Sequence, residues 1–199
     1  MDVRPQAGRV NQKARTRMAI LGAARELIQT GQPVTMPAVA QAALVSEPTA
    51  YRYFPDMLSL VTEAFAGLRP DPEEALRPVA GSGDPVERVA YAAEFLFRHV
   101  LDYQGAVRAM MAATIARPEL TSARPGLRFG LIDQALAPLS ATLAVTDPAR
   151  FSQLRLDLAV VVSAEALFAL TDLCGLTPEQ AIASATRTAR TLTTAAVTG

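Results

Sequence analysis

The stretch Thr35–Leu60, TMPAVAQAALVSEPTAYRYFPDMLSL, constrains the fold more than any other part of the sequence. Thr35 is a good N-terminal cap for a short helix, because its hydroxyl can accept a hydrogen bond from a first-turn amide. The chain must turn around Leu44, and Ser46 can cap a second short helix that ends before Pro55. The stretch therefore predicts two short helices joined by a tight turn and followed directly by a third helix.

Apolar residues recur at helical spacing through most of the chain, and no segment shows the sustained alternation of a strand. Ahead of the stretch, one apolar helix face runs through Ile20, Leu21, Ala24, Leu27 and Ile28. Beyond the stretch we expect helices over residues 84–103, 104–116, 125–143, 147–174 and 177–197, a loop over residues 117–126 and a kink at Pro138. The prediction is an all-α fold of about nine helices.

Two further segments lack this periodicity. Residues 1–10 predict a disordered arm, and residues 69–83, rich in proline, glycine and acidic residues, predict a linker or loop. A chain of 199 residues can hold a small domain and a larger one. We expect residues 1–55 to form the arm and a helix–turn–helix head. Residues 56–199 are expected to form a helical body, and the helix from residue 56 connects the two.

The composition argues against several classes of protein and site. The single cysteine, Cys174, cannot form an intrachain disulfide, and with one histidine, His99, the common metal-binding sets are missing. The most apolar run, Leu154–Leu173, carries four charged residues, so no membrane span is expected. No apolar segment precedes Met18, which predicts a cytoplasmic protein without a secretory signal. Because no nucleophile–base pair can be identified, we expect neither an enzyme nor a cofactor.

The charges are distributed unevenly, although 19 basic and 19 acidic residues give the whole chain a net charge of zero. Residues 1–55 hold seven basic and three acidic residues, a net charge of +4, which leaves −4 for the remainder. A basic head on an acidic body indicates that a polyanion contacts the head. The alternative is a solvated surface with a flexible basic tail.

The second short helix, within SEPTAYRYF, has side chains that suit a helix in the major groove of DNA. Thr49 could contact a thymine methyl group or a phosphate, and Arg52 could contact a phosphate or a guanine edge. Tyr51 and Tyr53 could reach phosphates through their hydroxyl groups. The alternative is that Tyr51 and Phe54 belong to the core and that Arg52 is merely solvated.

The sequence resembles the TetR family of transcriptional regulators over roughly residues 15–65. The residues that carry the resemblance are Ile20, Leu21, Ala23, Ala24, Leu27, Gly31, Thr35, Val39, Ala40, Val45, Ser46, Thr49, Tyr51, Arg52, Tyr53, Phe54 and Leu60. The resemblance implies a homodimer that binds a palindromic operator in double-stranded DNA and is released by a small, largely apolar effector. It also implies DNA-facing positions at Thr35, Glu47, Pro48, Thr49, Tyr51, Arg52 and Tyr53. Glu47 could instead serve the positive end of its helix.

Two departures from the family pattern bear on DNA binding. Leu44 stands where the family usually has a glycine in the turn, and a left-handed backbone there costs a non-glycine residue about 1–2 kcal/mol. Met57 stands where the family usually has a lysine that contacts a phosphate. Arginines of the N-terminal segment could compensate through the minor groove or the DNA backbone. These arginines are Arg4, Arg9, Arg15 and Arg17.

The body supplies candidate residues for an effector site. They are polar groups on helices expected to be buried, together with apolar or adaptable side chains: Tyr91, Phe95, His99, Tyr103, Met110, Met111, Phe129, Asp133, Glu165 and Phe168. Glu165 lies inside the apolar run AVVVSAEALFAL and needs an arginine, a histidine or a ligand group as its partner, because an unpaired buried carboxylate is costly. The alternatives are an ordinary core histidine for His99, and an ion pair or interface position for Glu165.

The last two predicted helices are expected to meet their copies in a second subunit and form a four-helix dimer interface. A seam of mostly small residues at intervals of three and four permits close approach of helices. The expected interface residues are Val161, Phe168, Ile182, Ala185, Ala189, Leu192 and Ala196. The alternative is that the seam packs within one chain.

Two functions remain open from the sequence. The first is a ligand-responsive transcriptional regulator, most simply a dimeric repressor at a pseudo-palindromic operator. The second is a small-molecule binding protein of the same fold whose specific DNA binding is weakened or lost, as Leu44 and Met57 suggest.

Overall fold

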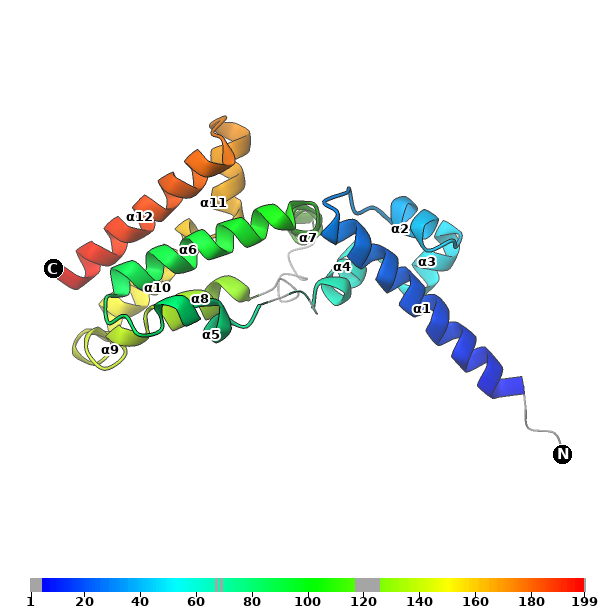
Figure 1. Ribbon diagram of the computed structural model, residues 1–199, viewed down its shortest axis with the longest axis horizontal. Helices are drawn as coiled ribbons and strands as arrows, with labels where there is room; N and C mark the ends of the chain where they lie inside the picture. The colour runs from blue at the N-terminus through cyan, green and yellow to red at the C-terminus, as the bar shows by residue number, and fades with distance from the viewer. Residues whose placement is uncertain (1–4, 67, 69, 117–125, 199) are drawn as a thin grey trace. The chain divides into compact units, whose positions relative to one another are not determined.

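The computed structural model describes residues 5–66, 68, 70–116 and 126–198, and all regular structure within them is helical (Figure 1). The predicted all-α fold is confirmed. The described residues contain twelve α-helices, α1–α12, instead of about nine. The larger number arises because short helices form within segments predicted as loops or as one long helix. None of the described helices is both long and apolar enough to cross a membrane.

The chain divides into two compact units. The N-terminal unit comprises residues 1–69 and 102–124, and the C-terminal unit comprises residues 70–101 and 125–199. The N-terminal unit includes α4 and α7 as well as the predicted head, because residues of both helices belong to its hydrophobic core. The N-terminal unit is therefore larger than the predicted head, which was expected to end at residue 55. The functional assignment of residues 56–199 stays a prediction.

The N-terminal unit is built on two capped short helices, as predicted. Its helices are α1 (Pro5–Gln29), α2 (Met36–Ala42), α3 (Glu47–Tyr53), α4 (Met57–Ala66) and α7 (Gln104–Ala116). Thr35 Oγ1 accepts a hydrogen bond from the amide of Ala38 at 3.3 Å, and Ser46 Oγ accepts one from the amide of Thr49 at 3.4 Å. These bonds satisfy first-turn amides that have no partner inside the helix, which is why α2 and α3 begin where they do.

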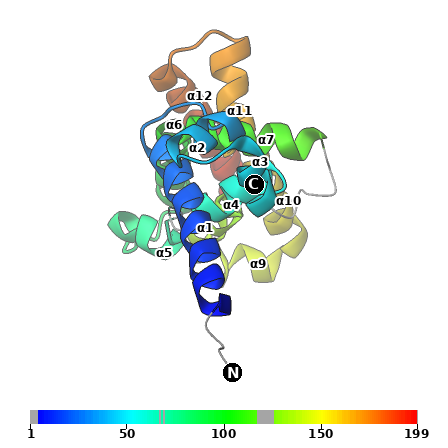
Figure 2. The same cartoon turned by 90° about the vertical axis from the view of Figure 1, so that its right-hand side faces the viewer.

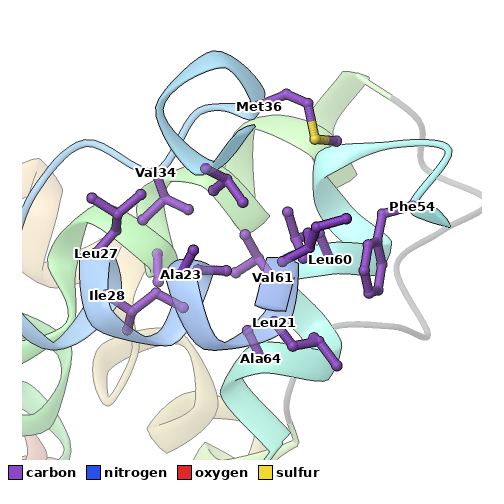
Figure 3. Packing of buried hydrophobic residues seen from close by; sticks show 14 of the residues in the cluster. Leu21, Ala23, Leu27, Ile28, Val34, Met36, Phe54, Leu60, Val61 and Ala64 are labelled. Carbon is purple, nitrogen blue, oxygen red and sulfur yellow. The ribbon is translucent and has the colours of Figure 1, made fainter. Parts of the chain in front are cut away.

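The core of the N-terminal unit lies where α1, α2 and α4 converge, with residues such as Leu21, Val61 and Phe54 pointing inward (Figure 3). Burial along α1 begins at Ile20, whereas residues 11–19 are exposed or half-buried. The N-terminal turns of α1 accordingly extend past α2 and α3 (Figures 1 and 2). Residues 11–19 of α1 therefore face solvent more than the core.

The C-terminal unit is a bundle in which α10 packs against α8, α9 and α12. Its helices are α5 (Pro72–Ala75), α6 (Pro85–Asp102, whose last residue belongs to the other unit), α8 (Leu127–Ala135), α9 (Leu143–Thr146), α10 (Pro148–Val161), α11 (Ala164–Phe168) and α12 (Pro178–Thr198). Short 3-10 turns at Arg77–Val79 and Ala137–Leu139 and a π-helical turn at Ala169–Leu173 complete it.

A buried arginine ties three elements of this unit together. Arg88 of α6 is 4% exposed, and its guanidinium donates to the carbonyls of Val79, Ala80, Gln134 and Ala135 at 2.7–3.2 Å. These carbonyls end the 3-10 turn and α8, where main-chain oxygens lack helical partners and carry partial negative charge. Arg88 therefore holds α6 against two helix ends.

The predicted helix over residues 147–174 is interrupted. α10 ends at Val161, and the backbone of Val162 (φ −87°, ψ 72°) leaves the helical region. Ser163 then caps α11 by accepting a hydrogen bond from the amide of Ala166 at 3.0 Å. Apolar periodicity continues across this break and therefore predicted a single helix. Ser163, a residue type that favours helix N-termini, was the local signal for a second helix.

Three other segments also differ from the prediction. α1 begins at Pro5, so residues 5–10 are helical instead of disordered, while residues 1–4 lie outside the described part. The expected linker over residues 69–83 contains α5 and a 3-10 turn. α8 ends at Ala135 instead of continuing with a kink, because Pro138 cannot donate the next helical hydrogen bond. Most of the predicted loop over residues 117–126 lies outside the described residues.

Candidate nucleic-acid interface

The turn between α2 and α3 adopts the left-handed backbone that a glycine would favour. Leu44 has φ 55° and is 93% exposed, so its side chain gains little packing in return for the unfavourable conformation. The amide of Leu44 donates to the carbonyl of Gln41 at 3.1 Å, and the amide of Val45 donates to that of Ala40 at 2.9 Å. The helix–turn–helix geometry is therefore formed in spite of the missing glycine, at the cost of local strain.

The helix predicted to enter the major groove, α3, turns one face to the core and the other to solvent. Ala50 and Phe54 are buried, whereas Tyr51 is 47% exposed and Arg52 is exposed. Phe54 is thus a core residue, and Tyr51 is available for binding. The other expected DNA contacts on or before α3 are distributed as follows: Thr35, Glu47 and Pro48 are exposed, and Thr49 and Tyr53 are half-buried.

A groove of about 740 Å³ runs between residues 12–16 of α1 and α3. Its lining residues are Gln12, Lys13, Thr16, Val45, Ser46, Thr49, Arg52 and Tyr53. Lys13 supplies a positive charge from α1 and Arg52 one from α3, where its guanidinium lies 5.6 Å from the ring centroid of Tyr53. Cationic, amide and hydroxyl groups of this kind are those that bind the phosphates of nucleic acid. Sequence reasoning missed Gln12, Lys13 and Thr16.

Arg17 does not behave as the free basic residue predicted for the N-terminal segment. Its guanidinium forms a two-point ion pair with Glu63 of α4 and lies 4.9 Å from the ring centroid of Phe54. The hydrogen bond with Glu63 raises the pKa of Arg17 above its ordinary value. Arg15, in contrast, is exposed. The N-terminal candidates Arg4 and Arg9 have side chains outside the described part of the structure.

Met57, which stands where a phosphate-binding lysine was expected, packs against the hydrophobic core of the N-terminal unit. It is half-buried at the start of α4. An apolar thioether there adds to the core and cannot contact a phosphate through a charge.

Three of the expected effector-site residues lie in the N-terminal unit. Met110 is part of the hydrophobic core, and Tyr103 packs against it with its ring edge-on to Phe65 at a centroid distance of 5.4 Å. Met111 is half-buried on the same helix, α7. Packing in the core is a sufficient reason for an apolar residue at Met110 and an aromatic residue at Tyr103, so neither residue type requires a bound ligand.

Three other candidates come together on α8 and α11 in the C-terminal unit. Glu165 pairs with Arg128 at 3.3 Å, and Asp133 forms a two-point ion pair with Arg155. The ring of Phe129 lies near both guanidinium groups, with centroid distances of 5.8 Å to Arg128 and 5.0 Å to Arg155. Of the partners left open for Glu165, which were an arginine, a histidine or a ligand group, the structure shows an arginine. The sequence could show that Glu165 needed a cation but not which arginine would reach it.

The remaining effector candidates are spread over α6 and α11. Phe95 and His99, one turn apart on α6, stack with nearly parallel rings at a centroid distance of 6.4 Å. Tyr91 is half-buried on α6, and Phe168 is buried at the end of α11.

The small-residue seam of α12 faces the chain's own core. Ile182, Ala185 and Ala189 are all buried within the single chain. Side chains already covered by their own subunit have little surface left for a partner, so the structure favours packing within one chain for these three residues. The other expected interface residues are Val161, Leu192 and Ala196, which are half-buried, and Phe168.

Residues 20–64 match the family described as bacterial regulatory proteins, tetR family. This match covers the buried C-terminal part of α1, the helix–turn–helix and most of α4. Neither a curated protein nor a solved structure matches the chain. The matched residues include those that orient α3 and form one wall of its basic groove. Residues 20–64 therefore form a helix–turn–helix domain of the tetR family of bacterial regulatory proteins, which makes this part of the chain the DNA-binding domain of a transcriptional regulator.

Proposed function

We propose that this regulator is a homodimeric repressor that binds a pseudo-palindromic operator and leaves it when a small, largely apolar molecule binds the C-terminal unit. The observation that carries the proposal is the exposed face of α3 beside the basic groove between α1 and α3. The groove joins α3 to a second element, α1, that has its own positive charge at Lys13.

In the proposed complex, α3 enters the major groove with its N-terminal residues toward the bases. Glu47 and Pro48 then meet base edges, and Thr49 contacts a thymine methyl group or a phosphate. Arg52 and Lys13, on the two sides of the groove, bind phosphates of the DNA backbone. Exposed Arg15 adds a further cation on α1.

Selection from a pool of random DNA duplexes tests operator recognition. The full chain is expected to enrich an inverted repeat, because two symmetry-related α3 helices read two half-sites. A competing pool of scrambled half-sites is the control for binding to any DNA. Failure to enrich an inverted repeat, with binding equal for all sequences, would contradict the proposed operator.

Dimerisation is best supported by the outer face of α10. Leu156 is 56% exposed and Val160, one turn later, is 72% exposed. Leu156 and Val160 lie four residues apart, so both side chains point to the same side of α10 and form a small apolar surface that a partner can cover. A second copy of the chain can cover them through the same face of its own α10, which gives a two-fold symmetric contact.

Sedimentation of the Leu156→Glu and Val160→Glu variants tests this contact. Both variants are expected to sediment as monomers at concentrations where the unmodified chain is a dimer, because a charge would have to be desolvated in the contact. Leu173→Glu is the matched control, since Leu173 is 84% exposed but lies outside α10. Equal dimerisation of all the variants would reject this face.

The proposed effector site lies in the C-terminal unit, around the residues that both sequence and packing single out. Phe129 offers an aromatic surface, and the ion pairs of Asp133 and Glu165 with arginines can open toward a polar group of a ligand. Tyr91, Phe95, His99 and Phe168 are the further candidate contacts in this unit. Met110 and Tyr103 pack in the core of the other unit, and Met111 is half-buried there.

A route from effector to DNA follows from the chain itself. α6 and α7 are separated by Tyr103 alone, and α7 packs against α4. A ligand that displaces the C-terminal end of α6 would therefore move α7 and α4, and with them the orientation of α3. A screen of small apolar molecules for release of the enriched operator tests this route. Release by a compound that also raises the Tm of the free protein supports it.

The alternative function is that of a small-molecule binding protein with weakened operator recognition. The strained Leu44 and the core-packed Met57 favour it, because both replace residues that assist DNA binding in the family. A specific site bound with nanomolar affinity would reject this alternative. Ligand binding accompanied only by weak, sequence-independent DNA binding would support it.

A further inference from the structure

A groove of about 250 Å³ between α6 and α12 brings charged side chains together at a place that DNA binding does not involve. One of its arginines is already engaged. Arg98 of α6 donates to Glu94 at 2.9 and 3.1 Å and to Glu179, at the start of α12, at 3.2 and 3.3 Å. This bridge joins the two helices and balances part of the local charge.

Two further arginines of the groove have no carboxylate partner within the described residues. Arg187 and Arg190 lie three residues apart on α12, so both guanidinium groups can point to the same side of the helix. Arg187 makes a single long hydrogen bond, to Ser184 Oγ at 3.5 Å. Both side chains are exposed, so their donor groups remain available to a molecule that enters the groove.

A hydroxyl group with unused bonding capacity lines the same groove. Thr186 Oγ1 is buried, and among the described residues it has no hydrogen-bond partner. Buried polar atoms in folded proteins are normally hydrogen-bonded, so this hydroxyl group has unused bonding capacity, which rotation of the Thr186 side chain can turn toward a ligand in the groove. Thr186 stands between the positions of Glu179 and Arg190 along α12.

The charges of the groove favour an anion. Three arginines and two glutamates leave one net positive charge, and the glutamates already share Arg98. Guanidinium groups bind carboxylate and phosphate oxygens in pairs through parallel N–H donors. A volume of about 250 Å³ lies below the roughly 300–1,000 Å³ of drug-sized ligand sites, so the anion must be small.

We propose that the groove between α6 and α12 binds a small oxyanion, held by Arg187 and Arg190 and by the hydroxyl group of Thr186. The recognised group is a carboxylate or a phosphate. The site is independent of the proposed operator and effector, because it requires neither DNA nor the cluster around Phe129.

Calorimetric titration of the full chain with inorganic phosphate and, separately, with propionate tests the proposal at a constant ionic strength. Saturable binding of at least one probe is expected, and the preferred probe identifies the source of the oxyanion. Arg187→Gln and Arg190→Gln are each expected to weaken binding tenfold or more. Arg77→Gln, which removes an exposed charge outside the groove, is the matched control and should bind like the unmodified chain.

Two additional variants separate a built site from general charge attraction. Thr186→Val keeps the shape of the side chain and removes the hydroxyl group, so it should weaken binding severalfold. Glu94→Gln frees part of Arg98 and should strengthen binding severalfold. Absence of saturable binding to either probe, or an equal loss of affinity in Arg77→Gln and Arg190→Gln, would overturn the proposal. Circular dichroism of each variant establishes that it is folded.

Discussion

Arg17 of α1 forms a two-point ion pair with Glu63 of α4, and the same guanidinium lies over the ring of Phe54, which follows α3. One side chain thereby connects three elements of the N-terminal unit. The pair joins α1, just ahead of its first buried residue Ile20, to α4, the helix that follows α3. Arg17 was predicted from the sequence to be a free positive charge, but in the structure it stabilises the packing of the N-terminal unit.

This pairing predicts how single charge removals change the salt dependence of DNA binding. Lys13→Gln and Arg52→Gln should each reduce the slope of log K against log [salt] by about one unit, because each would remove one of the proposed phosphate contacts. Arg17→Gln should leave the slope unchanged, since Arg17 binds Glu63 instead of a phosphate. Titration of the enriched operator at several salt concentrations measures the slopes. A reduced slope for Arg17→Gln would show that the ion pair opens on DNA.

The strained turn predicts that Leu44→Gly stabilises the protein. Glycine adopts φ 55° without the penalty of a Cβ atom, and the exposed leucine side chain contributes little packing. After the entropic cost of glycine is subtracted, the expected gain is about 0.5–1 kcal/mol, a rise in Tm of a few degrees at most. Leu44→Ala is the control, because it retains the Cβ atom and should leave Tm nearly unchanged. An equal gain for alanine would show that strain is not the cause.

The buried arginine predicts a large loss of stability on removal of its charge. Arg88→Met should lower the free energy of unfolding by about 3–5 kcal/mol, because several buried carbonyl groups lose their donors together. Arg88→Lys should lose less, since an ammonium group can still reach some of these oxygens. Urea unfolding measures both, with Arg77→Gln as the exposed control. A methionine variant as stable as the control would contradict the role assigned to Arg88.

A close approach of two helices predicts opposite effects of the same substitution at two glycines. A Cβ atom on Gly130 of α8 would lie 2.7 Å from Cγ of Pro72 in α5, so Gly130→Ala should cost about 1–3 kcal/mol. Gly22 of α1 has open space around it, and Gly22→Ala should stabilise by up to about 1 kcal/mol. Thermal unfolding compares the two variants. Equal stabilisation by the two substitutions would show that Pro72 of α5 moves away from the new Cβ atom at residue 130 without cost.

Local signals in the sequence were sufficient to predict the structure of the helix–turn–helix head. The hydroxyl caps at Thr35 and Ser46 set the starts of α2 and α3, because each bond spans only three residues. The apolar period identified an all-α chain, and the block Tyr51–Phe54 identified the recognition helix. The break at Ser163 was missed, since the apolar pattern is the same for one helix as for two that both face a core.

Contacts between distant residues were decided by the tertiary structure. The partners of Arg17, Arg88, Arg128 and Arg155 lie on other elements, and a sequence shows that a buried charge needs a partner without showing which one. The seam of α12 and the side chains of Tyr103 and Met110 have the composition of an interface or a ligand site, yet they pack within the chain. The sequence by itself determined which faces are apolar and which helix can read DNA. Only the tertiary structure decided what each apolar face meets, because hydrophobic burial is non-directional and the choice of partner depends on the shapes of surfaces far apart in the chain.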